Sequence, residues 1–471
     1  MDVQSEKKVR TSKLKRFFCY LFAIVAIFTL TSEGREKPNI LFVLFDDMGY
    51  GEPTSYRATS LFKTPNIDRL AKEGMRFTDA HSSAASCTPT RYGFLTGRYP
   101  HRIGQFGVLS TFSPPLIPDT RLTIASYLKK NGYTTACIGK WHMGMNWDRP
   151  KVKGKNKTKE KLKIGEKMNG GPNAIGFEYF YGFTHARNIQ SVIEQDTVVR
   201  EVKPVENQPL MIAKAVDFLK EHSSNKQKPF FLYFPMCPPH KPVVPAPEYV
   251  GKGGGGGKGS YADWVYQGDS MLGQLLDTLE STGLANNTLV LVSADNGAAG
   301  RDYPPLRDNK GSIYEGGHRE PFLAKWPGRI KPGSTSGQII SITDIFATCA
   351  EITGVTLPDN AGEDSVSFLN CLLGKQVGPF REACVQQSGK KAFAIRKGKW
   401  KLIVHGDNKR ELFDLNLDLG ETNNIIRTHP QVAAELSSLL QSYLDKGRST
   451  PGKAQPLEYR ISLDEIRFKK K

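Results

Sequence analysis

The sequence predicts an α/β protein with a largely parallel central sheet, followed by a smaller antiparallel sheet and a helix. Over most of the chain, apolar runs of strand length alternate with helical patterns. Several runs end in polar residues and glycine, which is typical of parallel strands whose functional loops follow their carboxyl ends. Toward the C-terminus, short strand-like segments are separated by turn residues, which favours antiparallel pairing.

Four segments are expected to form the parallel strands. The first, Ile40–Phe45, is an uninterrupted apolar run that leads into an acid pair and glycine, as in a strand buried on both faces. The other three also end in polar turns and span residues 134–142, 229–235 and 287–297. Because ligands bind outside the carboxyl ends of such strands, we expect the polar groups at these ends to converge.

Helical patterns separate the strands. They span residues 67–74, 123–131, 210–222 and 261–281. The glycine-rich stretch 251–259 is expected to be a flexible loop before the last of them. We assign residues 35–375 to a catalytic domain, whose size suits the core of one large domain.

Residues 376–471 are expected to form a C-terminal subdomain. Its antiparallel strands are predicted at 392–396, 400–404 and 411–415, and its helix at 430–446. The tail beyond Ser449 is basic and is expected to be loose.

Residues 1–34 have the pattern of an export signal. A positively charged segment precedes the apolar run Phe17–Leu30, which is 14 residues long and short for a membrane span. The interpretation is a signal peptide or an uncleaved signal anchor. We therefore expect a secreted or periplasmic protein, in contact with a membrane only if this segment stays attached.

The cysteines do not indicate a disulfide scaffold. With Cys19 in the leader and Cys87 set aside, five of the seven cysteines remain, so at most two bridges can form. Cys371 and Cys384 are the first pair to test.

The net charge of +18 indicates a polyanionic partner. Residues 1–34 contribute only +3, because six basic residues there face three acidic ones. The sequence contains no nucleic-acid motif, so we expect no nucleic acid as partner. A sulfated polysaccharide is also a polyanion and would be attracted by the same positive charge. The lysine-rich stretch 151–167 favours a solvated loop over a dedicated binding site.

Two of the predicted strand ends carry oxygen ligands. Asp46 and Asp47 follow the first strand, and Asp295 and Asn296 follow the last. Each pair alone is also a good turn sequence. Together they predict a site for Ca²⁺, with Mg²⁺ as second choice, because hard cations prefer carboxylate and amide oxygens and uncompensated carboxylates repel one another.

Cationic and imidazole side chains surround the same strand ends. They are Arg91, Lys140, His142, His240 and Lys310. A tetrahedral anion requires such donors on its oxygens as charge builds up during group transfer. A lone histidine is usually structural, so the inference depends on the convergence of the strand ends.

The segment Cys87–Arg91 carries the most specific motif of the chain. A free cysteine is commonly a small buried hydrophobe, but C-T-P-T-R matches the pattern C-x-P-x-R. Further matching segments occur in the same order: D-D-M-G at Asp46, G-K-W-H at Gly139, P-P-H-K-P at Pro238, S-A-D-N-G at Ser293 and K-G-S-I-Y-E-G-G at Lys310. Across residues 37–445 the chain resembles the type I, formylglycine-dependent sulfatases, in the branch of arylsulfatase A and N-acetylgalactosamine-6-sulfatase.

The resemblance implies an alkaline-phosphatase-like fold with a mixed, mostly parallel sheet. It also implies that a maturation enzyme converts Cys87 to formylglycine, whose hydrate attacks sulfur. The modified Cys87 would then join Asp46, Asp47, Asp295 and Asn296 around one Ca²⁺, with Arg91, Lys140, His142, His240 and Lys310 as catalytic residues. Thr90 departs from the usual Ser or Ala of the motif. An additional sulfate-binding residue of the family is not placed; Thr184 and His185 are the candidates.

The expected function is hydrolysis of sulfate esters on a carbohydrate or aryl group. A phosphate or phosphonate monoester hydrolase is an alternative, since fold does not separate the two. An inactive polyanion-binding protein is the third hypothesis, disfavoured by the intact set of catalytic residues.

Overall fold

The computed structural model describes residues 37–148, 161–224, 228–255, 257–463 and 467–470. The predicted export signal at 1–34 and most of the lysine-rich stretch lie outside these residues. Within them, none of the helices has the length and apolar character needed to cross a membrane.

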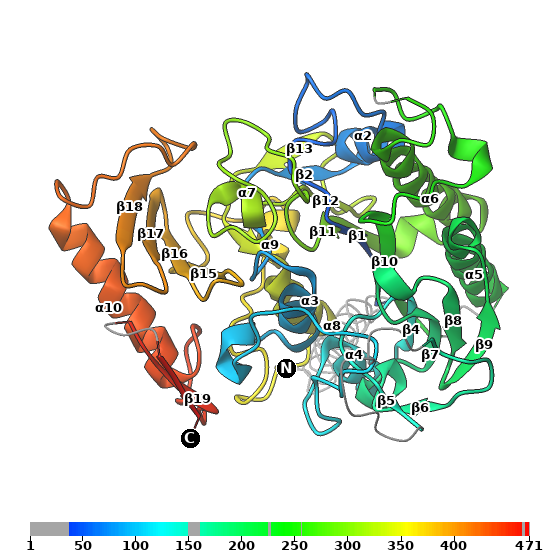
Figure 1. Ribbon diagram of the computed structural model, residues 1–471, viewed down its shortest axis with the longest axis horizontal. Coiled ribbons are helices and arrows are strands. Elements are labelled where there is room, and N and C mark those ends of the chain that lie inside the picture. The colour runs from blue at the N-terminus through cyan, green and yellow to red at the C-terminus, as the bar shows by residue number, and fades with distance from the viewer. Residues whose placement is uncertain (1–36, 149–160, 225–227, 256, 464–466, 471) are drawn as a thin grey trace, which may run out of the picture. The chain divides into compact units, whose positions relative to one another are not determined.

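The central sheet has ten strands in the order β13-β2-β12-β11-β1-β10-β4-β7-β8-β9 (Figure 1). Four of them are the predicted parallel strands: β1 (Asn39–Asp46), β4 (Thr134–Lys140), β10 (Phe230–Pro239) and β11 (Thr288–Ala294). The others are β2 (Met75–Phe77), β7 (Tyr179–Phe183), β8 (Ser191–Glu194), β9 (Thr197–Glu201), β12 (Phe322–Lys325) and β13 (Ser334–Ser336). Because β8, β9 and β12 run antiparallel to their neighbours, the sheet is mixed and mostly parallel, which confirms the predicted fold class.

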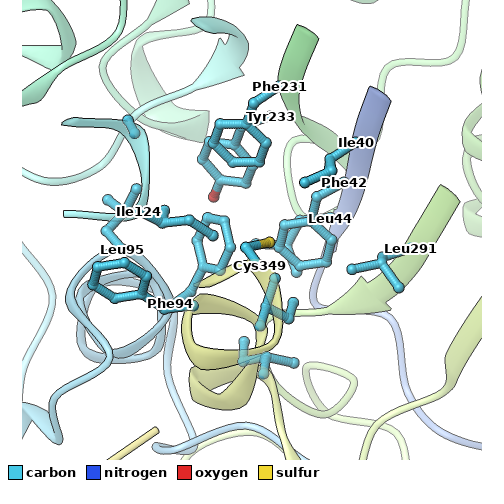
Figure 2. Close-up of a cluster of buried hydrophobic side chains, with 14 of the residues drawn as sticks. Ile40, Phe42, Leu44, Phe94, Leu95, Ile124, Phe231, Tyr233, Leu291 and Cys349 are labelled. Carbon is cyan, nitrogen blue, oxygen red and sulfur yellow. The ribbon is translucent and has the colours of Figure 1, made fainter. Parts of the chain in front are cut away.

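Strand β1 lies at the centre and separates two hydrophobic cores. Successive side chains of a strand point to opposite faces. Ile40, Phe42 and Leu44 enter one core together with helices α3 (Cys87–Thr96), α4 (Ile124–Lys130) and α8 (Ile345–Thr353), as Figure 2 shows for part of it. The alternate residues of β1 enter the other core, formed with α2 (Pro65–Glu73), α5 (Pro204–Ser224) and α6 (Tyr261–Ser281). Burial on both faces explains the continuous apolar run.

Local capping signals explain why two helices begin where the sequence predicts. Thr123 accepts a hydrogen bond from the backbone N–H of Ser126 and forms a capping box at α4. Ser260 caps α6 in the same way with Asp263. The Asp263 carboxylate also accepts backbone hydrogen bonds from Gly251, Gly253 and Gly259, so the glycine-rich loop is tied to the start of α6 rather than flexible at these points.

The C-terminal sheet contains four antiparallel strands and is covered by α10 (Pro430–Lys446). Its strands are β15 (Cys384–Gln387), β16 (Phe393–Lys397), β17 (Trp400–Val404) and β18 (Arg410–Asp414). Only β15 was not expected. The expectation of a loose tail is wrong for Tyr459–Ser462 (β19), because this segment pairs with Arg467–Lys470 (β20).

Short elements connect the larger ones. They are β3 (Ala80–His81), β5 (Asn146–Trp147), β6 (Met168–Asn169), β14 (Ile340–Ser341), α7 (Glu315–His318) and α9 (Leu369–Leu372), with 3₁₀ turns at Pro100–Ile103, Pro172–Ile175, Ala186–Asn188, Pro247–Tyr249, Ala285–Asn287 and Ile342–Asp344.

The expected Cys371–Cys384 bridge is not formed. All six described cysteines are free and buried. Cys371 packs in the core beside α8, whereas the sulfur of Cys384 accepts a hydrogen bond from Gln386. The two cysteine side chains therefore pack in different places.

Candidate active site

The carboxyl ends of β1 and β11 bring four oxygen-bearing side chains together. Parallel register places Phe45 opposite Ala294, so Asp46 and Asp47 meet Asp295 and Asn296. The backbone N–H of Asp47 donates to Asp295 Oδ1 at 3.0 Å, and Asn296 Nδ2 donates to Asp47 Oδ1 at 2.7 Å. All four residues are buried, and Asp47 has a φ of 67°. A non-glycine residue held in the left-handed region is typical of functional sites.

Cys87 is the first residue of α3 and lies against this cluster. Its Sγ is 3.4 Å from Asp46 Oδ1, 3.8 Å from Asp47 Oδ1 and 3.4 Å from Lys310 Nζ. Burial, more than any other cause, raises the pKa of the Cys87 thiol. The unmodified thiol therefore stays protonated and is a poor nucleophile.

Arg91 follows one turn later on α3 and is completely buried. Its Nε and one terminal nitrogen donate to Asp295 Oδ2, at 3.1 and 2.8 Å. The other terminal nitrogen donates to the Tyr233 hydroxyl and to the Lys140 carbonyl, both at 3.3 Å. Tyr233 was missed because it lies within the apolar run of β10, where its pattern is that of a core residue.

Two lysines complete the charge balance. Lys140 Nζ is 2.6 Å from Asp46 Oδ2, and Lys310 Nζ contacts Asp47 Oδ1. Burial raises the pKa of Asp46, but Lys140 and the other nearby cations lower it more, to about 2. Three carboxylates thus face three cations, with Arg91 as the third. The sequence argument treated these carboxylates as uncompensated, and this is wrong: the basic residues expected around the strand ends pair with them one by one.

His142 is held as a neutral base. The strand β4 ends at Lys140, short of the predicted end at residue 142, and His142 has a φ of 58°. Its Nε2 donates to the Leu109 carbonyl at 2.9 Å, while its Nδ1 is buried without a partner among the described residues. Burial and then the Lys140 charge hold the pKa of His142 well below its usual range. The Nδ1 lone pair is therefore available to accept a proton.

The remaining candidates lie toward the rim. His240 Nε2 is 3.6 Å from Asp47 Oδ2, and 19% of its side chain is exposed. The His185 ring lies tilted against the His142 ring with centroids 5.4 Å apart, and its Nε2 is 2.9 Å from Thr111 Oγ1. Thr184 Oγ1 is 3.4 Å from the same hydroxyl. Both candidates for an added sulfate contact thus lie beside His142, and their role stays a prediction.

The donor set fits a hard divalent cation. Asp46, Asp47, Cys87 and His240 offer ligand atoms that all lie within 4.8 Å of one another. Asp295 and Asn296 join this group through their hydrogen bonds with Asp47. Asn296 Oδ1 is buried and has no hydrogen-bond partner within the described part of the chain. An orphaned buried amide oxygen is costly, and a metal ion would satisfy it.

Glu52 supports the loop that follows the acid pair. Its Oε1 accepts hydrogen bonds from the hydroxyls of Tyr261, at 2.6 Å, and Tyr303, at 2.9 Å. Glu52 is completely buried, and this burial raises its pKa from 4.5 to about 7. Sequence patterns gave no signal for it, because its partners lie in α6 and in a distant loop.

We expect the Glu52→Gln variant to change the pH dependence of stability. The Glu52 carboxyl binds its proton more tightly in the folded state than in the unfolded state. The free energy of unfolding therefore falls as pH rises from 4.5 through about 7. Between pH 5 and pH 8, the free energy of unfolding of the variant should rise by about 2.5 kcal/mol relative to that of the native protein. Urea unfolding at the two pH values measures this difference. Glu435→Gln, an exposed site on α10, is the control, and equal behaviour of the two variants would contradict the expectation.

Comparisons with known proteins agree with this geometry. The sulfatase family model matches residues 38–355, and the N-sulphoglucosamine sulphohydrolase C-terminal model matches residues 308–449. N-acetylgalactosamine-6-O-sulfatase of Bacteroides thetaiotaomicron is 32% identical, with 87% of this chain and 94% of that protein covered. Arylsulfatase A of Bos taurus is 33% identical, with 84% and 85% covered. The solved structure of Ps i-CgsB in complex with k-i-k-neocarrahexaose has a TM-score of 0.74 at 26% identity, covering 89% of this chain and 95% of that one.

Proposed function

The chain belongs to the sulfatase family and is a sulfuric ester hydrolase, and we propose that it acts through formylglycine at position 87 beside a bound Ca²⁺. The observation that carries the proposal is the contact of Cys87 with Asp46, Asp47 and Lys310. Neither a phosphate or phosphonate monoester hydrolase nor an inactive polyanion-binding protein is supported, because the matching family models and the relatives above are sulfatases.

The proposed metal and modification would supply the reactive groups. Asp46, Asp47, Asp295, Asn296 and the oxygen on residue 87 would hold Ca²⁺, which places positive charge beside the nucleophile and the sulfate oxygens. A formylglycine hydrate supplies one hydroxyl that attacks sulfur and a second whose deprotonation lets sulfate leave and the aldehyde return. A serine lacks this second hydroxyl.

The other residues bind the sulfate group and move protons. Lys140 and Lys310 stay charged beside the carboxylates and would donate to sulfate oxygens, where charge develops. Arg91 fixes Asp295 and the start of α3 in place. His240 or Lys310 would protonate the leaving alcohol, and the neutral Nδ1 of His142 would accept the proton from the second hydroxyl.

We further propose a sulfated carbohydrate as the natural substrate and an exported location for the enzyme. Support for the substrate comes from the relative named for N-acetylgalactosamine 6-sulfate and from the oligosaccharide bound to Ps i-CgsB. Support for export is the signal pattern of residues 1–34. A formylglycine-generating maturation enzyme would then be an obligatory partner.

The test is release of inorganic sulfate by the mature enzyme from a panel of defined sulfated glycans and one aryl sulfate. Sulfate release from at least one sugar ester supports the proposal. Hydrolysis of matched phosphate esters with no release of sulfate from any panel member would contradict it.

Salt should weaken action on a long glycan more than action on an aryl sulfate. The basic surface can steer a polyanion over a distance, whereas a small ester senses mainly the buried site. The Debye length falls from about 10 Å at 0.1 M salt to about 3 Å at 1 M, so kcat/KM for the glycan should fall steeply. Parallel salt titrations of kcat/KM measure both slopes. Equal slopes would mean that the surface charge has no role in substrate capture.

A further inference from the structure

A cavity of about 720 Å³ lies between the catalytic body and the C-terminal sheet, apart from the residues of the active site. Its wall includes residues 337–339, 378–379, 381–383 and 396–400, together with Asp79 and Asn416. Four cationic side chains contribute to the wall: Arg381, Arg396, Lys397 and Lys399. Only two acidic side chains, Asp79 and Glu382, do so. The lining therefore carries an excess of positive charge.

Two arginines of the wall are buried with a donor left over. Arg381 donates from one terminal nitrogen to Asp344 at 2.9 Å, and Arg396 donates to Asp79 at 3.0 Å. Their exposed fractions are 9% and 3%. The Nε of each has no hydrogen-bond partner among the described residues. An unsatisfied buried donor destabilises a fold by about 1–3 kcal/mol, and an anionic oxygen would remove this penalty.

The rim adds exposed cations and an aromatic face. The side chains of Lys397 and Lys399 are 52% and 44% exposed, and they pair with Glu382 at 3.5 Å and with Asp414 at 2.7 Å. Lys399 Nζ lies 4.6 Å from the centroid of the Trp400 ring, which is half-buried. A sulfated sugar presents an anionic group next to an apolar ring face, and a cation beside an indole is complementary to that combination.

The alternative is that these arginines serve only as ion pairs that fasten the C-terminal sheet. Their terminal nitrogens do bind Asp344 and Asp79. That role explains neither the two orphaned Nε donors nor the open space in front of a lining with excess positive charge. We propose that this cavity is a second glycan-binding site, which takes a sulfate group of the substrate away from the ester that is cleaved.

The cavity adjoins the chain segments that support the nucleophile. β15 follows the wall residues 381–383, and its Gln387 accepts a hydrogen bond from the backbone N–H of Ala85, at 3.0 Å, just before Cys87. The assignment rests on the proposed function for its substrate class, but none of the proposed catalytic residues lines the cavity.

The experiment measures binding by calorimetry to the full chain carrying Cys87→Ala, which prevents turnover. The probes are a sulfated chondroitin hexasaccharide, its desulfated counterpart and inorganic sulfate. Lys397→Glu with Lys399→Glu reverses charge at exposed positions and should weaken the Kd of the sulfated hexasaccharide about tenfold. The matched control, Lys130→Glu with Lys220→Glu, makes the same charge change at exposed positions on α4 and α5 and should leave this Kd unchanged.

A third variant removes the space and leaves the charges. An added Cβ at Gly337 would meet only Thr78 Oγ1, at 3.9 Å, so the backbone has room for a side chain at this position. Gly337→Trp should also weaken the hexasaccharide Kd. An unchanged Kd for the sulfated hexasaccharide in both cavity variants would overturn the proposal. A Kd for inorganic sulfate that weakens as much as that of the hexasaccharide would also overturn it, because the cavity would then be a site for the free ion. Aryl sulfate turnover, measured with Cys87 present, should stay at the native level in all three variants. Failure of the native enzyme on the aryl sulfate and on the glycan panel would instead contradict the proposed function.

Discussion

Replacing Cys87 by serine is expected to lower kcat by roughly 10⁴-fold or more, the scale seen when a nucleophile is removed. Serine can form a sulfate ester but has no second hydroxyl from which His142 could take a proton to release sulfate. The ester should therefore accumulate on residue 87. Hydrolysis of an aryl sulfate gives the rate, and peptide mass spectrometry detects the trapped ester.

The same measurement tests the modification in the native enzyme. The peptide that contains Cys87 should be lighter than its thiol form and should react with a hydrazide probe. Cys371→Ala, at another buried cysteine outside the site, is the matched control and should keep normal turnover. Full activity of a preparation that contains only the thiol form would refute the mechanism.

Replacing Asp47 by alanine is expected to remove the bound metal and to lower turnover by roughly 10²- to 10³-fold, as for loss of one electrostatic contact in a catalytic site. Asp47 contributes a carboxylate to the proposed metal site and contacts Lys310. Its removal also leaves Asn296 Nδ2 with only the Gly297 carbonyl as acceptor, so a second proposed ligand is held less firmly. Elemental analysis gives the metal content, and circular dichroism checks the fold.

Asp277→Ala, which removes an exposed carboxylate from α6, is the control for Asp47→Ala and should change neither the metal content nor the turnover. Because a buried ion exchanges slowly, chelation alone does not decide the question, and the ion itself must be counted. A fully active native protein whose metal content is zero would contradict the assignment, as would undiminished metal in Asp47→Ala.

Some elements were predictable because their signals are local. The helices Tyr261–Ser281 and Pro430–Lys446 begin and end where the sequence predicts. In the first, Ser260 caps the backbone within its own turn; in the second, proline stands at the start and Gly447 in the left-handed conformation at the end. Strands β2, β8 and β12 were missed, because strands of three to five residues take their stability from partners distant in the sequence.

The sequence by itself determined the chemical identity of the site. Apolar runs that end in Asp46-Asp47 and Asp295-Asn296, with the motif Cys87–Arg91, identified the fold class and the family, since buried strands and a five-residue motif are both local patterns. Only the tertiary structure decided how the charges are balanced. It placed Lys140 on Asp46 and Arg91 on Asp295, and it left Nδ1 of His142 without a partner among the residues that the structure describes. These arrangements join residues that lie up to 204 positions apart, and no local pattern encodes which distant side chain fills the space beside a buried charge.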